Sequence, residues 1–424
     1  MRFAHIADVH IGSWRDPRMR SKSVSAFISC IDSCITRNVD FLVISGDLFN
    51  TALPPIDLMK QAVEQLIRLR EAAIPVYLIA GSHDYSVSGK TMLDVLEKTG
   101  LFTNVMRGHV DEAHAVHLDP VVDEKTGCLI TGILGKAGML DKHYYESLAR
   151  VPLQQRITAH KGPSIFLFHT AIREYLPSRM GRMEALPLSF LPKGFDYYAG
   201  GHVHYRFERR EDRYGRIAYP GPLFPANFAE LEELGCGSFI MVENDSIEWI
   251  KVAPNTHVPI VCDITGKSAA HIREELMRKA EASNLTDAIV TLRLKGHLHD
   301  GFLRDIGLPD VIDSLYEKGA YFVMKNSASV KIDAFDAVSV DVTNKDSIER
   351  ELIEEHCQKN PLKLVHDQKH FIHRMMDTLA SCRHEAEKVG DFETRLTENI
   401  ADLIEKGTDE SGNRPRLTVI NQES

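Results

Sequence analysis

The sequence predicts an α/β fold with parallel strands, followed by a smaller α+β domain and a helical segment. Three observations support this prediction. Apolar strand patterns alternate with amphipathic helix patterns over residues 1–80, as parallel βαβ units require. Strands and helices alternate again over residues 255–340. From about residue 344 onward, only helical patterns remain.

The first elements follow from apolar periodicity. Residues 3–7, 39–45 and 74–80 are apolar runs typical of strands. Residues 23–37 and 55–72 lie between these runs and carry apolar side chains at helical spacing. We therefore expect functional groups at the carboxyl ends of the strands, where open α/β sheets bind their ligands.

The remaining patterns complete four predicted segments. Further strands cover 128–134, 164–169 and 197–200, and a hairpin over 237–250 around Asn244-Asp245 closes the first domain near Ala253. The second domain has strands at 258–264, 288–294 and 321–327 and helices at 269–282 and 309–318. Helices at 347–358, 366–388 and 393–406 form the third segment. The predicted boundaries are 1–254, 255–340, 344–406 and a flexible tail at 407–424.

Composition narrows the class of protein. Of the 424 residues, 43% are hydrophobic and 26% are charged, as in ordinary globular proteins. No apolar run approaches the roughly 20 residues of a membrane helix. Seven cysteines without a CxxC pair suit a reducing cytoplasm, and an N-terminus that runs directly into a strand predicts no removable signal peptide. The net charge of −10 argues against a general nucleic-acid coat, although bound cations and a local basic patch would allow a nucleic-acid enzyme.

Five short motifs place Asp or His where an apolar stretch ends. In chain order they are Asp8-Val9-His10, Gly46-Asp47, Gly81-Ser82-His83-Asp84, Phe168-His169-Thr170 and Gly201-His202-Val203-His204. At a strand end, the i, i+2 spacing points two side chains to the same side, so that they can share one cation. A carboxylate such as Asp47 has two oxygens and can bridge two cations, although alone it would read as a helix cap. Paired cations about 3.5–4 Å apart are a solution for cleaving phosphate esters.

A second block with the same pattern tests how strongly a single motif predicts a metal site. Gly296-His297-Leu298-His299 repeats the Gly-His-x-His pattern in the second domain, without further Asp and His motifs around it. Asp300-Gly301 follows as a turn signal, so we interpret this block as a solvated loop. The order of the five motifs therefore carries the prediction, not any one of them.

The ordered set resembles the signature of calcineurin-like metallophosphoesterases, in which Asp-x-His, Gly-Asp, Gly-Asn-His-Asp, a lone His and Gly-His-x-His follow one another. Residues 2–12, 46–49, 168–174 and 219–222 resemble, within that family, the nuclease subunits of the double-strand-break repair complex, which include the meiotic recombination eleven nuclease and SbcD. The resemblance covers residues 1–340 and continues loosely into the helical segment. It implies a four-layer αββα metallophosphoesterase sandwich whose small α+β domain caps the active site.

The resemblance also implies roles for the motif residues. One metal would bind Asp8, His10, Asp47 and His204, and the other would bind Asp47, residue 82, His169 and His202. His83 would be catalytic, touching the phosphate or assisting the leaving oxygen. Imidazole and carboxylate ligands suit two Mn²⁺ ions and similar divalent cations. Asp84 either orients His83 or caps the following turn.

Two positions depart from the family pattern. Ser82 replaces an asparagine whose amide oxygen would bind the second metal, and a serine hydroxyl is a shorter, poorer neutral ligand. We therefore predict a more weakly held second metal. Asn50 stands where some relatives carry a histidine near the scissile phosphate.

Other residues are candidates for macromolecular contacts. Phosphate contacts and base stacking are expected from the loop after the first motif and from a basic residue after the fourth, namely Trp14, Arg15, Arg18, Arg20, Lys22 and Arg173. Individually, most such charges are simply solvated. The apolar stripe of Phe371, Met375 and Leu379 either docks a partner or belongs to a terminal helical hairpin packed on its own chain.

The leading interpretation is a manganese-dependent DNA nuclease, cleaving 3′-to-5′ at DNA ends and endonucleolytically on single strands. The resemblance implies an ABC/SMC-like ATPase partner docked on the helical segment, a homodimer formed around residues 55–72 and 90–98, and a cytoplasmic, nucleoid-associated location. One alternative is a phosphodiesterase for small molecules or cyclic nucleotides, which would need neither capping domain nor tail. A second alternative, admitted by Ser82 and Asn50, is a DNA-end scaffold that barely cleaves.

Overall fold

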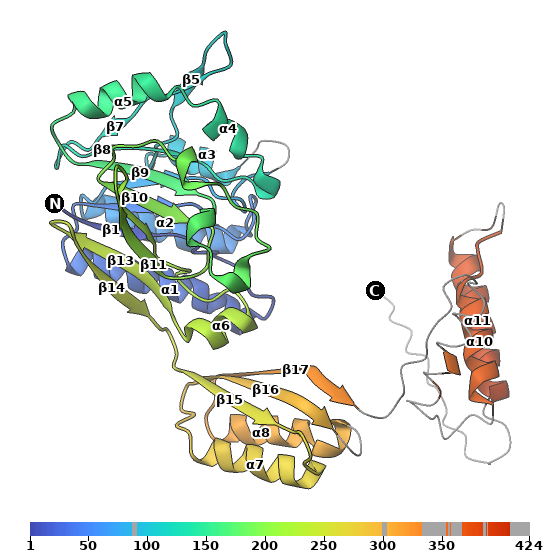
Figure 1. Cartoon of the computed structure of the whole chain (residues 1–424). Helices are drawn as coiled ribbons and strands as arrows, with labels where there is room; N and C mark the ends of the chain where they lie inside the picture. The colour runs from blue at the N-terminus through green and yellow to red at the C-terminus, as the bar shows by residue number, and fades with distance from the viewer. Residues whose placement is uncertain are drawn as a thin grey trace. The chain divides into compact units, whose positions relative to one another are not determined.

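The structure, a computed structural model, describes residues 1–86, 91–298, 303–332, 353–354, 357, 367–384, 387 and 389–407. Its largest part contains two six-stranded sheets (Figure 1). None of the helices in these described ranges is long and apolar enough to cross a lipid bilayer.

The first sheet has the order β14-β13-β1-β2-β3-β4. Strands β1 to β4 are parallel to one another, whereas β13 and β14 pair antiparallel. The bounds are β1 (Arg2–Ile6), β2 (Phe41–Ser45), β3 (Val76–Ile79), β4 (Thr103–Asn104), β13 (Gly237–Glu243) and β14 (Ser246–Val252). The predicted hairpin is confirmed, and Asn244 and Asp245 turn it at positive φ angles of 44° and 76°.

The second sheet has the order β11-β12-β10-β9-β8-β7. Its four central strands are parallel and its edge strands, β7 and β11, are antiparallel. The bounds are β7 (Val121–Val122), β8 (Leu129–Ile133), β9 (Ser164–His169), β10 (Tyr197–Gly201), β11 (Phe207–Glu211) and β12 (Gly215–Tyr219). A small hairpin of β5 (Gly108–Val110) and β6 (Val116–Leu118) lies outside both sheets.

The predicted four-layer αββα sandwich is confirmed by how side chains alternate along each strand. Phe3 and Phe41 point between the sheets, where their rings stack at 5.1 Å, and Leu167 of β9 lies in the same buried cluster. Leu42 of β2 points the other way, into the core beneath the helices of the first sheet. Phe166 of β9 points into the core beneath the helices of the second. Figure 1 shows α1 and α5 on opposite sides of the sheets.

The helices that cover the sheets are short to medium in length. Their bounds are α1 (Pro17–Thr36), α2 (Ile56–Glu71), α3 (Met92–Lys98), α4 (Lys142–Glu146), α5 (Arg150–Ala159) and α6 (Phe228–Leu234). Helix α1 begins six residues before the predicted start at residue 23, because Asp16 caps it by accepting the Arg18 amide at 2.8 Å and Pro17 occupies its first turn. Arg18, Arg20 and Lys22 therefore lie on a helix and not in the predicted loop.

A separate three-stranded sheet, of order β15-β16-β17, follows the sandwich. Its bounds are β15 (His257–Asp263), β16 (Ile289–Leu298) and β17 (Phe322–Ile332), with α7 (Ala269–Glu281) and α8 (Leu308–Glu317). The loop prediction for Gly296-His297-Leu298 is wrong, because these residues continue β16 and Leu298 is only 1% exposed. His299 lies outside the described residues.

The helical segment is confirmed in part. Helices α10 (Gln368–Leu379) and α11 (Val389–Gly407) pack against each other as a hairpin, in which Arg395 pairs with Glu387. The prediction of one helix over 366–388 is wrong, since α10 ends at Leu379 and the Ser381 hydroxyl donates to the carbonyl of Thr378. Most of the helix predicted over 347–358, and residues 408–424, lie outside the described part of the chain.

Candidate metal centre

The five motifs converge at the carboxyl ends of strands from both sheets. Asp8 and Asp47 follow β1 and β2, Ser82 follows β3, His169 ends β9, and His202 follows β10. Asp8, Asp47 and His169 are at most 2% exposed. The sheets are joined at this point by a 2.7 Å hydrogen bond from His169 Nδ1 to the carbonyl of Ser45. The candidate residues thus lie together at strand ends, where the sequence places them.

The backbone is strained at this position. Asp8, His10, Asp47 and His202 have positive φ angles of 51°, 45°, 53° and 85°. Non-glycine residues rarely adopt this conformation, and it persists where surrounding structure enforces it. The amide of His10 donates to the carbonyl of Asp47 at 3.0 Å, so neighbouring strand ends hold one another in place.

Two glycines leave the space that the side chains need. A Cβ at Gly46, whose φ is 88°, would lie 2.3 Å from His169 Nδ1. A Cβ at Gly81 would lie 2.2 Å from Asp47 Oδ1. Both motifs therefore require glycine for steric reasons.

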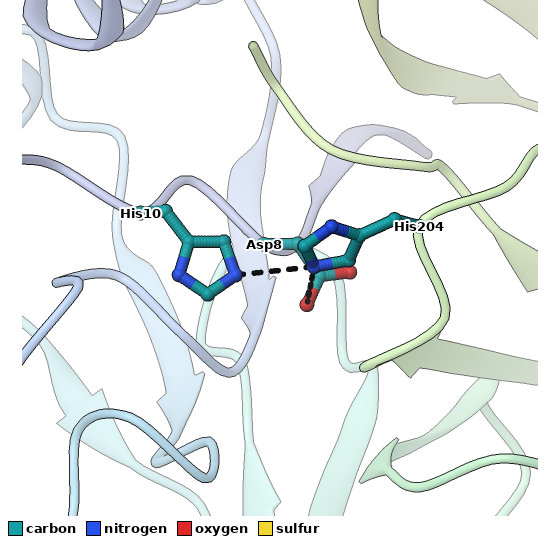
Figure 2. A group of neighbouring side chains, drawn as sticks. All are labelled: Asp8, His10 and His204. Atoms are coloured by element: carbon teal, nitrogen blue, oxygen red, sulfur yellow. Dashed lines mark hydrogen bonds and ion pairs between the residues drawn. The ribbon is translucent and has the colours of Figure 1, made fainter. Parts of the chain in front are cut away.

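One group of donors consists of Asp8, His10 and His204 (Figure 2). The Nε2 atoms of His10 and His204 are 3.1 Å apart, and His204 Nε2 lies 3.8 Å from Asp8 Oδ1. Asp47 Oδ2 is 3.6 Å from His10 Nε2. Asp47 thus lies beside this group of three donors.

A second set of donors lies around Asp47, and Asp8 is also close to Asp47 and His169. His169 Nε2 is 3.2 Å and Ser82 Oγ is 3.5 Å from Asp47 Oδ2. The rings of His169 and His202 are 5.3 Å apart. The other carboxylate oxygen, Oδ1, accepts the backbone amide of His83 at 2.8 Å. A single oxygen of Asp47 therefore faces both groups.

The donor atoms fit divalent cations. His169 donates through Nδ1 to Ser45, so in the neutral ring Nε2 carries a lone pair, and this buried atom has no hydrogen-bond partner. That lone pair points toward the Asp47 carboxylate. Two electron-rich groups in such contact repel each other unless a positive charge lies between them, and a cation bound by both supplies that charge.

The pKa values of the histidines also indicate that positive charge is stabilised beside the buried carboxylates. Burial opposes protonation of His169, but the Asp47 carboxylate raises the pKa of His169 to about 10, so that without a metal a proton on Nε2 supplies this charge. Burial also opposes protonation of His204, but the hydrogen bond that its Nδ1 donates to Glu230 outweighs burial and raises the pKa of His204 to about 9. Burial lowers the pKa of His10 and of His202 to about 3, which keeps both rings neutral and able to act as ligands.

His83 lies at the rim of the site and is exposed. Its Nδ1 is 2.9 Å from the carbonyl of Asn50, which fixes the ring and leaves Nε2 for other partners. Asp84 is buried and accepts the amides of Phe49 and Gly81 at 2.9 and 3.0 Å. Asp84 thus holds the loops together, and the ring of His83 is oriented by Asn50.

Sequence reasoning missed Glu230, whose Oε1 lies 2.9 Å from His204 Nδ1. Glu230 also accepts the amide of Ala226 at 2.8 Å, while Asn227 caps α6 by accepting the Glu230 amide at 3.0 Å. The Asn-x-x-Glu spacing is a helix-start signal that reveals α6. It does not reveal the histidine, which lies 26 residues away.

Most of the candidate DNA-contacting residues make hydrogen bonds or ring contacts with other residues of the chain. Trp14 Nε1 donates to the Pro225 carbonyl at 3.0 Å, Arg20 Nε donates to the Trp14 carbonyl at 2.9 Å, and Arg173 donates to the Ala185 carbonyl at 3.1 Å. Arg18 lies 4.5 Å from the centre of the Phe322 ring, and Lys22 Nζ lies 3.9 Å from that of Tyr321. Arg15 is exposed.

Comparison with known families agrees with this geometry. Residues 1–206 match the family described as calcineurin-like phosphoesterase. These residues belong to a calcineurin-like phosphoesterase domain. All seven predicted metal ligands lie within this phosphoesterase domain, as does His83.

The chain that contains the phosphoesterase domain is similar to archaeal proteins named DNA double-strand break repair protein Mre11. It is 29% identical to that of Archaeoglobus fulgidus over 52% of this chain and 49% of the relative. It is 32% identical to that of Sulfolobus acidocaldarius over 50% of this chain and 51% of the relative. It is 28% identical to that of Methanopyrus kandleri over 68% of this chain and 64% of the relative. The chain thus spans about half to two thirds of the length of these relatives. A solved dimetal phosphatase from Danio rerio aligns with 59% of this chain and 98% of its own, with a TM-score of 0.39 and 10% identity.

Replacing Ser82 by asparagine should lower the Mn²⁺ concentration that half-saturates the phosphoesterase domain. The Ser82 hydroxyl ends 3.5 Å from Asp47 Oδ2, and an amide oxygen would reach further and bind better. We expect a shift of about tenfold or less, as for partners at the edge of a metal site. A Mn²⁺ titration of both proteins measures it, and identical curves would contradict the prediction. Ser82→Ala is the control, because it raises the Mn²⁺ requirement only if the hydroxyl itself takes part.

Proposed function

We propose that the chain is a manganese-dependent DNA nuclease that processes double-strand breaks, with 3′-to-5′ exonuclease and single-strand endonuclease activity. The observation that carries the proposal is that donors of two groups lie close to the same atom, Asp47 Oδ2, with the exposed His83 ring 4.7 Å from that of His10. The similarity to archaeal Mre11 proteins supports DNA as the substrate.

In this proposal, Asp8, His10, Asp47 and His204 hold one ion, and Asp47, Ser82, His169 and His202 hold the other. When bound, such ions would supply an activated water and the positive charge that phosphodiester hydrolysis needs. Other groups of the chain hold the ligands of these ions in position. Ser45 and Glu230 orient His169 and His204 through Nδ1, and the backbone amide of His83 holds Asp47.

His83 is proposed as the group that assists departure of the leaving oxygen. With Nδ1 facing the Asn50 carbonyl at 2.9 Å, the exposed edge of the ring presents Nε2 to a bound phosphodiester. A protonated Nε2 would donate to the leaving oxygen, and its charge would also attract the phosphate. Neither role needs His83 to bind metal.

The proposed partners follow from exposed apolar side chains. Leu53, Ile56 and Val95 are 66%, 78% and 53% exposed, and the Met92 amide donates to the Ala52 carbonyl, which places α3 beside the start of α2. This apolar surface supports the proposed homodimer. On α10, Phe371 and Met375 are half-buried within the hairpin and Leu379 is 57% exposed, which leaves part of the stripe for an ABC/SMC-like ATPase.

A substrate panel tests the proposed function. The purified chain with Mn²⁺ is given end-labelled duplex DNA, hairpin DNA, single-stranded DNA and a chromogenic phosphodiester. We expect release of nucleotides from 3′ ends and internal cuts in the single strand. Cleavage of the chromogenic ester alone would indicate a small-molecule phosphodiesterase, and DNA binding without cleavage would indicate a scaffold.

A further inference from the structure

Helix α6 carries three glutamates that contact three different parts of the chain. Glu230 contacts His204 of the metal centre at 2.9 Å. Glu232 pairs with Arg293 of β16, and Glu233 pairs with Arg179. The helix therefore links the three-stranded sheet to a proposed metal ligand.

The Arg293–Glu232 contact is built to hold α6 in one orientation. Arg293 Nε lies 3.0 and 2.8 Å from the two Glu232 oxygens, and Nη2 donates to Oε2 at 2.5 Å. The guanidinium also lies 5.2 Å from the centre of the Phe228 ring. A forked hydrogen bond combined with a cation–π contact fixes direction, which a single charge contact would not. The side chains are 26% and 17% exposed, so solvent screens the pair only in part.

Helical geometry relates this contact to the metal centre. Phe228 and Glu232 are four residues apart and share one face of α6, and Arg293 contacts this face. Glu230 lies two residues from each and projects from the opposite side, toward His204. A carboxylate on the Nδ1 side of a ligand histidine fixes the ring and makes its Nε2 a better donor.

We infer that Arg293 is a positioning residue for the metal centre, which holds α6 so that Glu230 stays against His204. The inference rests on the proposed function, because it takes His204 as a metal ligand. The ion bound by His204 should therefore bind more weakly when Arg293 is removed. Asn227 also donates to Glu230, at 2.5 Å, so the loss of Arg293 should only partly release this carboxylate.

Calorimetric titration of the full chain with Mn²⁺ tests the inference. We expect Arg293→Ala to weaken one of two classes of Mn²⁺ site by about three- to tenfold, toward the low end of outer-shell effects. The other class should be unchanged, which general destabilisation would not produce. The matched control is Arg273→Ala, which removes a 2.9 Å pair with Asp310 inside the same small domain and does not touch α6. Wild-type affinities in Arg293→Ala, or an equal loss in Arg273→Ala, would overturn the inference.

A double variant separates positioning from other roles. Glu230→Gln should weaken the same class of site more than Arg293→Ala does. Combining the two should add nothing to Glu230→Gln, because Arg293 acts through Glu230. Losses that simply add would overturn the inference and leave the proposed function standing. A wild-type chain that binds no Mn²⁺ would overturn both.

Discussion

Replacing Asp47 by asparagine should abolish the binding of both ions and lower phosphodiester cleavage by more than about 100-fold, since even outer-shell partners of metal ligands contribute about 10–100-fold. Asp47 Oδ2 lies 3.6 Å from His10 Nε2 and 3.2 Å from His169 Nε2, so both donor groups depend on this one atom. Neutral asparagine would remove the charge that the cations share.

The substitution should leave the fold intact. Asparagine tolerates the positive φ of 53° at this position. Its amide oxygen can still accept the His83 amide, and its NH₂ can donate to His169 Nε2, which has no hydrogen-bond partner in the structure. Thermal unfolding without metal should therefore change little, whereas the stabilisation that Mn²⁺ gives the wild-type chain should disappear.

Asp123→Asn is a matched control for this experiment. Asp123 is also a buried carboxylate, 1% exposed, but it accepts the Tyr77 hydroxyl at 2.8 Å between the sheets and lies outside the donor groups. Its replacement should lower stability and leave Mn²⁺ stoichiometry unchanged. Retention of two ions by Asp47→Asn would show that Asp47 does not bridge them.

Replacing His83 by leucine should reduce cleavage by about 10²–10⁴-fold, the usual contribution of a positioned proton donor, while Mn²⁺ affinity stays within about twofold. The ring is exposed, and Asp47 is held by the backbone amide of His83, which the substitution keeps. Cleavage and Mn²⁺ affinity are measured on the same preparation. His109→Leu is the control, because His109 is another exposed histidine and lies on the separate β5–β6 hairpin.

The outcome distinguishes two roles for His83 from the scaffold alternative. His10, Asp47 and His83 also lie close enough together to share an ion, so a parallel loss of Mn²⁺ binding and cleavage would make His83 a ligand. A loss of cleavage alone would support the proposed role at the leaving oxygen. Unchanged cleavage would favour the scaffold alternative.

Local patterns predicted the strands well and the helix ends less well. Residues 164–169 were predicted and observed as a strand with identical bounds, because an unbroken apolar run ends there at a polar motif. The start of α1 was missed because Met19 is the only apolar side chain between Pro17 and Ser23, so that the Asp16 cap and Pro17 are the main signals of this start. Gly296 to Leu298 was misread as a loop because a single apolar residue, Leu298, anchors it in β16.

The sequence by itself determined which residues could bind metal, because strand-end spacing and residue chemistry are local properties of the chain. It also determined that Ser82 departs from the expected ligand. Only the tertiary structure decided which groups hold these residues in place. The Ser45 carbonyl meets His169 across 124 residues, and Glu230 meets His204 across 26 residues that include β11 and β12. Such contacts depend on how two sheets and a helix pack together, and no local pattern encodes that packing.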